Sequence, residues 1–228
     1  RNIIETQGAE SDADISYQVA MKMYKEHPEK YWFPDQYSNP DAIAAHHDTT
    51  GAEIWEQTGG NVDALVLTQG TGGTLTGVGR YLRERNPKVK LYAVEPTEAP
   101  MLSKRKWGSH KIEGIGDGFV PRNLDVSMLD GVVTVTSDEA IYYAKQLMLK
   151  EKILAGISSG ANVAAAIKVA KKHPELKHIV VMMNDSAMRY FTTELFDVKK
   201  VVEIPEREHP IDEYTKEQLD KYQSKWEI

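Results

Sequence analysis

The residues best suited to chemistry form a short glycine- and threonine-rich stretch, Gly70-Thr71-Gly72-Gly73-Thr74. An apolar run at residues 64–67 precedes it and predicts a strand buried on both faces, and a helical pattern follows it. A strand that ends in glycines before a helix directs unpaired backbone N–H groups, together with the positive end of the helix dipole, toward one point. The threonines add hydroxyl donors. We interpret this stretch as a cradle for an anion, most often a phosphate group.

Other glycine-rich loops fit these residues less well. A nucleoside-triphosphate loop needs a lysine and then a serine or threonine after its last glycine, but Leu75 and Thr76 follow Thr74 here. The dinucleotide pattern, started at Gly70, would need a glycine at the position of Leu75. A tight turn that binds nothing stays open as an alternative, because glycine also serves turns that need a positive φ.

Two further polar turns follow apolar runs. Gly156-Ile157-Ser158-Ser159-Gly160 comes after residues 153–155, and Asn184-Asp185-Ser186 comes after residues 178–183. With further strands expected at 90–95 and 132–135, alternating with helical patterns, the chain predicts an α/β fold with a parallel-sheet core covered by helices. Ligands bind such sheets beyond the carboxyl ends of the strands, so we expect the three polar turns to converge on one site.

Several local elements are also expected. The N-terminal part should contain a helix from residue 15 to about 26, a short strand at 31–33, a helical turn at 41–47 and a separate helix at 48–57. Further along, Ser137 is expected to cap one helix, and residues 184–186 should cap another that carries Met188, Phe191 and Leu195. In the charged tail, Thr215 and Gln218 match a capping box, and both a docked helix and a frayed end are compatible with the pattern.

The composition narrows the possible functions. The 228 residues are 41% hydrophobic and 27% charged, as in an ordinary globular domain, and no apolar run has the ~20 residues that span a bilayer. The absence of cysteine excludes disulfides, thiolate metal sites and a cysteine nucleophile. A net charge of −6 and the lack of a basic stripe argue against nucleic acid as a partner. His46 and His47 are adjacent and lack ligands at suitable spacing, so we expect no metal site there.

Five motifs occur in the order found in one known family. They are Ser38-Asn39-Pro40, the stretch from His46 through Asp48-Thr49-Thr50-Gly51 to Ile54, Gly70–Thr74, Gly114-Ile115-Gly116 and Gly156–Gly160. Together they resemble the cysteine synthase / cystathionine β-synthase family, pyridoxal-phosphate enzymes of fold type II. The resemblance covers roughly residues 15–198.

The resemblance implies a cofactor, pyridoxal 5′-phosphate, and a role for each matching residue. Gly70, Thr71, Gly72, Gly73 and Thr74 match the cup for its phosphate, and Ser158 matches the serine that meets its pyridine nitrogen. A neutral partner leaves that nitrogen unprotonated, which suits β-elimination and replacement. Gln36 matches a residue near the substrate carboxylate, and Gly114 matches a loop that lines the amino-acid site. Asp185-Ser186 is expected beside the ring nitrogen.

The implied reaction replaces the β-substituent of an activated serine, such as O-acetylserine, by sulfide to form cysteine. Residues 114–121 resemble the cysteine synthases more closely, whereas residues 184–190 are closer to the cystathionine synthases, which use serine and the thiol homocysteine. We expect a homodimeric, cytoplasmic enzyme, and the composition described above argues against nucleic-acid and membrane partners.

One departure from the family concerns the lysine that holds the cofactor as a Schiff base. None of the lysines in this chain stands in the matching context, and the chain starts at Arg1 rather than at a methionine. We therefore expect the C-terminal portion of such an enzyme, with no catalytic residue assigned. Residues 1–36 would be a remnant of the smaller domain, 37–204 the larger domain and 205–228 a charged tail. A non-catalytic module that binds a phosphorylated ligand or a partner protein is the alternative.

Overall fold

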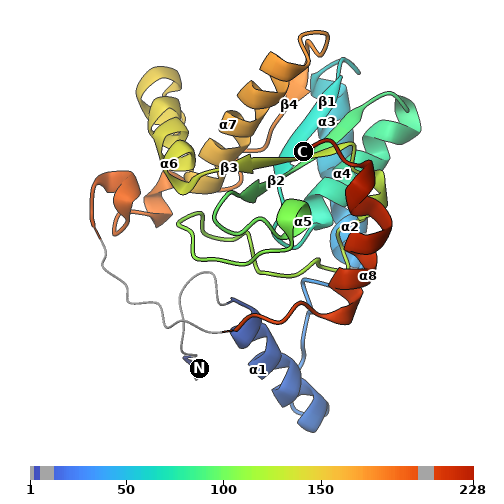
Figure 1. Cartoon of the computed structure of the whole chain (residues 1–228), viewed down its shortest axis with the longest axis vertical. Helices are drawn as coiled ribbons and strands as arrows, with labels where there is room; N and C mark the ends of the chain where they lie inside the picture. Colours follow the sequence, from blue (N-terminus) through green and yellow to red (C-terminus); the bar gives the residue numbers. More distant parts are fainter. Residues whose placement is uncertain (1–2, 6–12, 200–207) are drawn as a thin grey trace.

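A parallel four-stranded sheet forms the centre of the part of the chain that the structure, a computed structural model, describes, namely residues 3–5, 13–199 and 208–228 (Figure 1). The strands lie in the order β3-β2-β1-β4. Their bounds are Ala64–Thr68 for β1, Lys90–Pro96 for β2, Gly131–Val135 for β3 and Ile179–Val180 for β4. The expected α/β class with a parallel sheet is therefore confirmed.

Helices cover both faces of this sheet. Helices α6 and α7 lie on one side, α4 and α8 lie on the other, and α2 packs against α4 (Figure 1). The helices are α1 (Ala13–Glu26), α2 (Asp41–Ala45), α3 (Ala52–Gln57), α4 (Gly73–Arg85), α5 (Met101–Lys104), α6 (Ser137–Gln146), α7 (Ile157–Lys172) and α8 (Glu213–Tyr222). A π-helical turn, His46–Gly51, joins α2 to α3, and another, Leu147–Glu151, ends α6.

Strand β1 contributes to two cores because its side chains alternate across the sheet. Ala64 and Val66 pack in the cluster that contains apolar residues of α6 and α7. Leu65 and Leu67 pack in the cluster that contains those of α4 and α8. All five residues of β1 are buried, as expected for a parallel strand with a helix layer on each face.

Three of the expected strands differ from the structure. Residues 31–33 form no strand, and Trp32 is 85% exposed. Residues 153–155 contribute a single antiparallel bridge, from Ala155 to Ser186. Strand β4 spans two residues instead of the six predicted at 178–183, because the side chain of Asn162 replaces the ladder beyond Val180.

Some helix ends also differ from the predictions. Thr136, not Ser137, caps α6: its hydroxyl accepts from the Glu139 N–H at 3.1 Å, while the Glu139 carboxylate accepts from the Thr136 N–H at 2.9 Å. The turn expected at 156–160 is mostly the first turn of α7. Ser186 caps only a short 3₁₀ segment, and the residues expected on a helix behind it include the exposed Met188 and Phe191. The predicted break near residue 48 is a π-helical turn.

Helix α1 lies apart from the two helix layers (Figure 1). Its Tyr17 donates to Asp35 Oδ1 at 3.0 Å and packs its ring against Tyr37 and Phe119, with centroids 5.0 and 6.3 Å away. These contacts connect α1 to the segment before α2 and to the loop after β2. The domain division at residues 36 and 204 stays a prediction.

The C-terminal segment is docked, which decides between the two alternatives for the tail over residues 208–228. Leu219 and Trp226 are buried in the core that contains α4, and the Trp226 indole N–H donates to the Val126 carbonyl at 3.2 Å. Asp212, rather than Thr215, is the N-cap of α8, and its carboxylate accepts from the Thr215 N–H at 3.0 Å. Residues 205–207 lie outside the described part of the chain.

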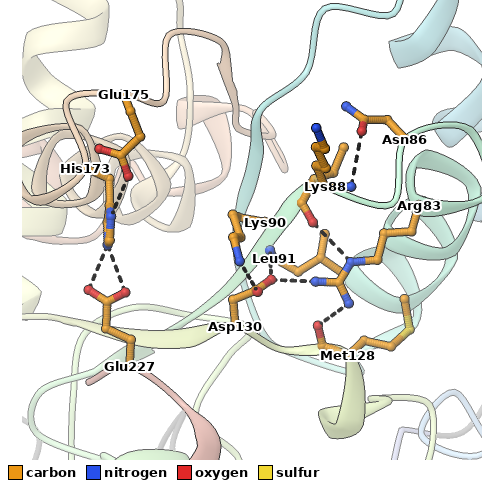
Figure 2. Close-up of polar contacts among 11 residues, drawn as sticks. Arg83, Asn86, Lys88, Lys90, Leu91, Met128, Asp130, His173, Glu175 and Glu227 are labelled. Carbon is orange, nitrogen blue, oxygen red and sulfur yellow. Dashed lines mark hydrogen bonds and ion pairs between the residues drawn. The ribbon is translucent and has the colours of Figure 1, made fainter.

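The carboxylates of Asp130 and Glu227 lie beside β3, the edge strand of the sheet, and bind side chains from neighbouring elements (Figure 2). Asp130 binds Arg83, Lys90 and the Leu91 N–H. The backbone of Glu227 pairs with residues 130–132, so the chain end extends the sheet. The Glu227 carboxylate lies 2.8 Å from His173 Nε2 and 2.6 Å from Lys172 Nζ. The segment that follows α8 is thus fastened by backbone pairing and by charge.

We expect Glu227→Gln to lower the free energy of unfolding by up to about 1 kcal/mol near pH 6 and by less near pH 9. Glu227 raises the pKa of His173 above 6.5, so this stabilisation is complete below about pH 6.5 and is lost as the pH rises through the folded-state pKa. Burial opposes ionisation of Glu227, but Lys172 and His173 lower its pKa below 4.5, so its contribution is lost only in acid. Thermal unfolding followed by circular dichroism measures the difference. In a His173→Gln background, Glu227→Gln should lower the free energy of unfolding by the same amount at pH 6 and pH 9. If the effect of Glu227→Gln still changed with pH there, His173 would not be the source of the pH dependence.

Candidate functional site

The glycine–threonine stretch lies between the carboxyl end of β1 and the start of α4. Gly72 caps the helix with a left-handed φ of +84°, and the first helical hydrogen bond runs from the Thr76 N–H to the Gly72 carbonyl at 3.0 Å. The N–H groups of Gly73, Thr74 and Leu75 therefore have no partner within the helix. They face outward from a 13-residue helix whose dipole is positive at this end. The arrangement suits an anion such as a phosphate group.

Two glycines here allow close contacts with other loops. A Cβ on Gly70 would lie 2.5 Å from the Gly114 carbonyl oxygen, and one on Gly72 would lie 2.7 Å from the Leu124 nitrogen. Gly70 thus brings residues 70–74, the loop expected to bind an anion (the anion loop), against the loop at Gly114 that is expected to line the amino-acid site. Gly72 faces protein, so a larger residue there would strain the fold whether or not a ligand binds. Substitutions of the threonine hydroxyls are the cleaner test.

His46 supports one of these hydroxyls. Its Nε2 lies 3.1 Å from Thr74 Oγ1, and its Nδ1 lies 3.0 Å from Thr50 Oγ1. Burial lowers the pKa of His46, so the imidazole is neutral at pH 7. The neighbouring His47 instead contacts Asp48 and Glu84. Within the described residues, no group of three or more His, Asp or Glu side chains is arranged to hold a metal ion.

Ser158 lies in the first turn of α7, 5% exposed, and contacts the end of β1 through Asn184. The Asn184 Nδ2 donates to Ser158 Oγ at 3.0 Å and to Thr68 Oγ1 at 3.1 Å. The Gly156 N–H donates to the Asp185 carbonyl at 3.0 Å. These contacts bring two of the three polar turns, 156–160 and 184–186, to the carboxyl end of β1, which leads into the third turn at 70–74. Asp185 is adjacent to the start of α7, and a Cβ on Gly156 would collide with its Oδ1.

The loop from Gly114 to Gly118 borders the same region through the contact with Gly70. Gly114, Gly116 and Gly118 have φ angles of +85°, +76° and +83°, which side chains other than glycine rarely adopt. The space beside Gly114 is open, since an added Cβ would meet no atom within 4 Å. Gly114 itself is exposed, and the role of this loop in substrate binding stays a prediction.

Gln36, assigned to the substrate carboxylate, lies in an exposed turn before α2. Its backbone is held: the Asn123 side chain donates to the Gln36 carbonyl at 3.0 Å, and the Asn123 N–H donates to the Tyr37 carbonyl at 3.0 Å. Asn123 precedes Leu124, the residue that contacts Gly72. The turn is therefore connected to the anion loop through one short segment.

Asp117, in the loop from Gly114 to Gly118, is a buried carboxyl that the sequence analysis did not single out. Burial raises its pKa, the nearby Asp14 raises it further, and a hydrogen bond from Tyr37 acts in the opposite direction. A buried titratable group of this kind is common at functional sites. The sequence offered no strong signal, because one Asp between two glycines also suits a solvent-exposed turn.

The residues present fit pyridoxal phosphate. The α4 N-terminus offers backbone and threonine donors for a phosphate dianion, and Ser158 offers a neutral hydroxyl at the other end of the site. Gly70 lets the loop at Gly114 approach residues 70–74 closely, and the space beside Gly114 is open. Among the described residues, no helix combines the length and the apolar character needed to cross a bilayer.

Comparisons with known proteins agree with this fit. Residues 1–185 match the model of a family described as pyridoxal-phosphate dependent enzyme. The chain is 52% identical over 164 residues to cysteine synthase 3 of Caenorhabditis elegans, covering 71% of this chain and 48% of that protein. It is 46% identical over 204 residues to cysteine synthase A of Escherichia coli strain K12, covering 86% and 63%.

A solved structure is similar as well. The crystal structure of cysteine synthase from Entamoeba histolytica matches with a TM-score of 0.74 and 32% sequence identity, over 91% of this chain and 58% of that chain. The chain thus spans about half to three-fifths of the length of the relatives that it matches.

We expect Thr74→Val to weaken the binding of a phosphate-bearing ligand by roughly 10-fold or more, because a hydrogen bond to a charged group is lost. Isothermal titration with pyridoxal 5′-phosphate measures the change. Thr49→Val is the control, since the Thr49 hydroxyl donates to the Ala45 carbonyl on the exposed surface. Equal affinity of Thr74→Val and wild type would remove Thr74 from the anion site.

We expect Asp117→Asn to raise the melting temperature at pH 7 by about 2–4 °C, the change that about 1 kcal/mol produces in a chain of this size. The pKa of Asp117 in the fold lies above its ordinary value of 3.8. The protonated Asp117 carboxyl therefore contributes fully to stability below about pH 3.8, and this contribution is lost as the pH rises through the folded-state pKa. The gain should therefore shrink toward pH 4 in calorimetric scans. Asp48→Asn, at a side chain that is 74% exposed, should show no such gain, and an equal gain there would contradict the prediction.

Proposed function

This chain belongs to the family of pyridoxal-phosphate dependent enzymes, and we propose that it serves a β-replacement that forms cysteine from an activated serine, such as O-acetylserine, and sulfide. The main support for this proposal is the set of contacts that connects the start of α4 with the Ser158 hydroxyl. The anion loop at the N-terminus of α4 is joined through Thr68 and Asn184 to the Ser158 hydroxyl at the N-terminus of α7. A phosphate and a ring nitrogen of one cofactor suit these two ends.

The residues of this chain bind and orient. The N–H groups of residues 73–75 and the hydroxyls of Thr71 and Thr74 would hold the phosphate, and neutral His46 orients Thr74 without adding charge. Ser158 would meet the ring nitrogen with a neutral hydroxyl instead of a carboxylic acid, which favours the unprotonated nitrogen. When bound, pyridoxal phosphate supplies an electron sink for the bond changes at the α- and β-carbons of the amino acid.

The amino-acid substrate is assigned to the Gly114 loop, which contacts Gly70, and to the turn at Gln36, which Asn123 connects to Leu124 beside Gly72. The exposed Gln36 amide provides hydrogen bonds for a carboxylate, and its backbone is fixed by Asn123. The open space beside Gly114 accommodates the substrate's side chain. Cysteine synthase is the name of the three relatives described above, which supports sulfide rather than homocysteine as the nucleophile. The homodimer and the cytoplasmic location stay predictions.

No residue of the chain is assigned as the Schiff-base lysine or as the base that removes the α-proton. We therefore expect residues 1–228 to bind pyridoxal phosphate but to form cysteine at least about 10²-fold more slowly than a chain extended by any coding sequence before Arg1 that supplies the family's lysine, because general-base catalysis contributes this factor or more. Cysteine formed from O-acetylserine and sulfide, at equal cofactor occupancy, is the measurement.

Two controls make the result specific. Cysteine synthase A of Escherichia coli shows that the assay works, and homocysteine in place of sulfide tests for cystathionine formation. Rapid turnover by the 228-residue chain would mean that one of its own lysines does the chemistry. Failure of both chains to bind pyridoxal phosphate would favour the non-catalytic alternative.

A further inference from the structure

Asn184 has a hydrogen-bonding pattern that neither the family resemblance nor the sequence analysis assigned. Its side-chain amide group contacts two hydroxyl oxygens, Ser158 Oγ at 3.0 Å and Thr68 Oγ1 at 3.1 Å. The NH₂ group has two hydrogens, so each can be given to one hydroxyl oxygen. Its backbone N–H donates separately to Ser159 Oγ at 2.9 Å. The side chain can therefore be changed while the backbone contact stays in place.

A hydroxyl that accepts from Asn184 keeps its single hydrogen for another acceptor. Ser158 lies at the N-terminus of α7, where the backbone offers N–H donors rather than free carbonyl oxygens. The hydrogen of Ser158 is thereby available to the site instead of being used inside the protein. Asn184 itself is exposed, so it occupies the boundary between Ser158 and solvent.

We propose that Asn184 is a positioning residue that makes Ser158 a hydrogen-bond donor toward the ring nitrogen of the cofactor. The proposal rests on the proposed function and deepens it, because it names the residue that fixes the direction of this hydrogen bond. A serine that donates stabilises the unprotonated nitrogen, whereas a serine that accepts stabilises the protonated one. Asn184 thus favours the electronic state that suits β-replacement.

Asp185 is the competing group. Its Oδ1 is buried without a hydrogen-bond partner among the described residues, next to Gly156. Its Oδ2 accepts from the Tyr190 hydroxyl at 2.6 Å and lies 3.7 Å from Arg189 Nε. If this carboxylate rather than Ser158 faced the ring nitrogen, the nitrogen would be protonated. The two arrangements therefore differ in a measurable property.

The test uses 4′-deoxypyridoxine 5′-phosphate labelled with ¹⁵N in the ring, which lacks the aldehyde and so binds without a lysine. In the wild-type chain we expect the ¹⁵N chemical shift of a hydrogen-bonded, unprotonated nitrogen at neutral pH. In Asn184→Asp, Ser158 should donate to the new carboxylate, the ¹⁵N resonance should move toward the protonated position, and affinity should fall about five- to tenfold. Asn184→Leu should show a smaller change in the same direction.

Matched variants separate positioning from general disturbance. Ser158→Ala should weaken binding to a similar extent, and adding Asn184→Asp to it should change nothing further, because both act through one hydrogen bond. Asn61→Asp, at an exposed asparagine in the turn before β1, should leave the shift and the affinity unchanged.

Each result has a defined meaning. An unchanged ¹⁵N shift and affinity in Asn184→Asp, or additive losses in the double variant, would overturn the role of Asn184 while leaving the cofactor site intact. A protonated nitrogen in the wild type would overturn it in favour of Asp185. A wild-type chain that does not bind the analogue would remove the proposed function itself, and this role with it.

Discussion

One buried side chain, Asn162, controls how the sheet ends at the site. It extends from α7, is fully buried, accepts from the Thr68 N–H at 2.6 Å and donates to the Met182 carbonyl at 2.8 Å. It thereby replaces the direct pairing of β1 with β4, which stops at Leu65 and Val180. Buried backbone groups must be paired, so the amide allows two strands to separate without leaving an N–H or a carbonyl unsatisfied. The separated strand ends carry Thr68 and Asn184, which is how the site gains its polar edge.

Close backbone contacts at glycines then bring the loops together. The Gly70–Gly114 contact joins the anion loop to the loop after β2, and the Gly72–Leu124 contact joins it to the segment that holds the turn at Gln36. A methyl group at either glycine would separate these loops by its own size, because backbone atoms cannot move aside as a flexible side chain can. The site is therefore built by loops that depend on one another for position.

The residues that stabilise the fold and the residues of the candidate site lie in different parts of the molecule. The apolar clusters on the two faces of β1, together with the docked segment around Leu219 and Trp226, hold the sheet. Near the site, by contrast, the structure keeps a buried carboxyl at Asp117 and a buried oxygen on Asp185 that has no hydrogen-bond partner among the described residues. Such features cost stability and persist where a function needs them.

The sequence by itself determined the α/β class, the strands β1, β2 and β3, and the junction between β1 and α4 at the glycine–threonine stretch, because apolar runs and glycine–helix junctions are local patterns. The tertiary structure alone decided that β4 stops at Val180, since that depends on Asn162 from another element. It alone decided that Thr136 caps α6 instead of its neighbour Ser137, because cap geometry requires coordinates. The pairing of Asn184 with Ser158 and the docking of the C-terminal segment are contacts between residues far apart in the chain, and no spacing within the sequence records them.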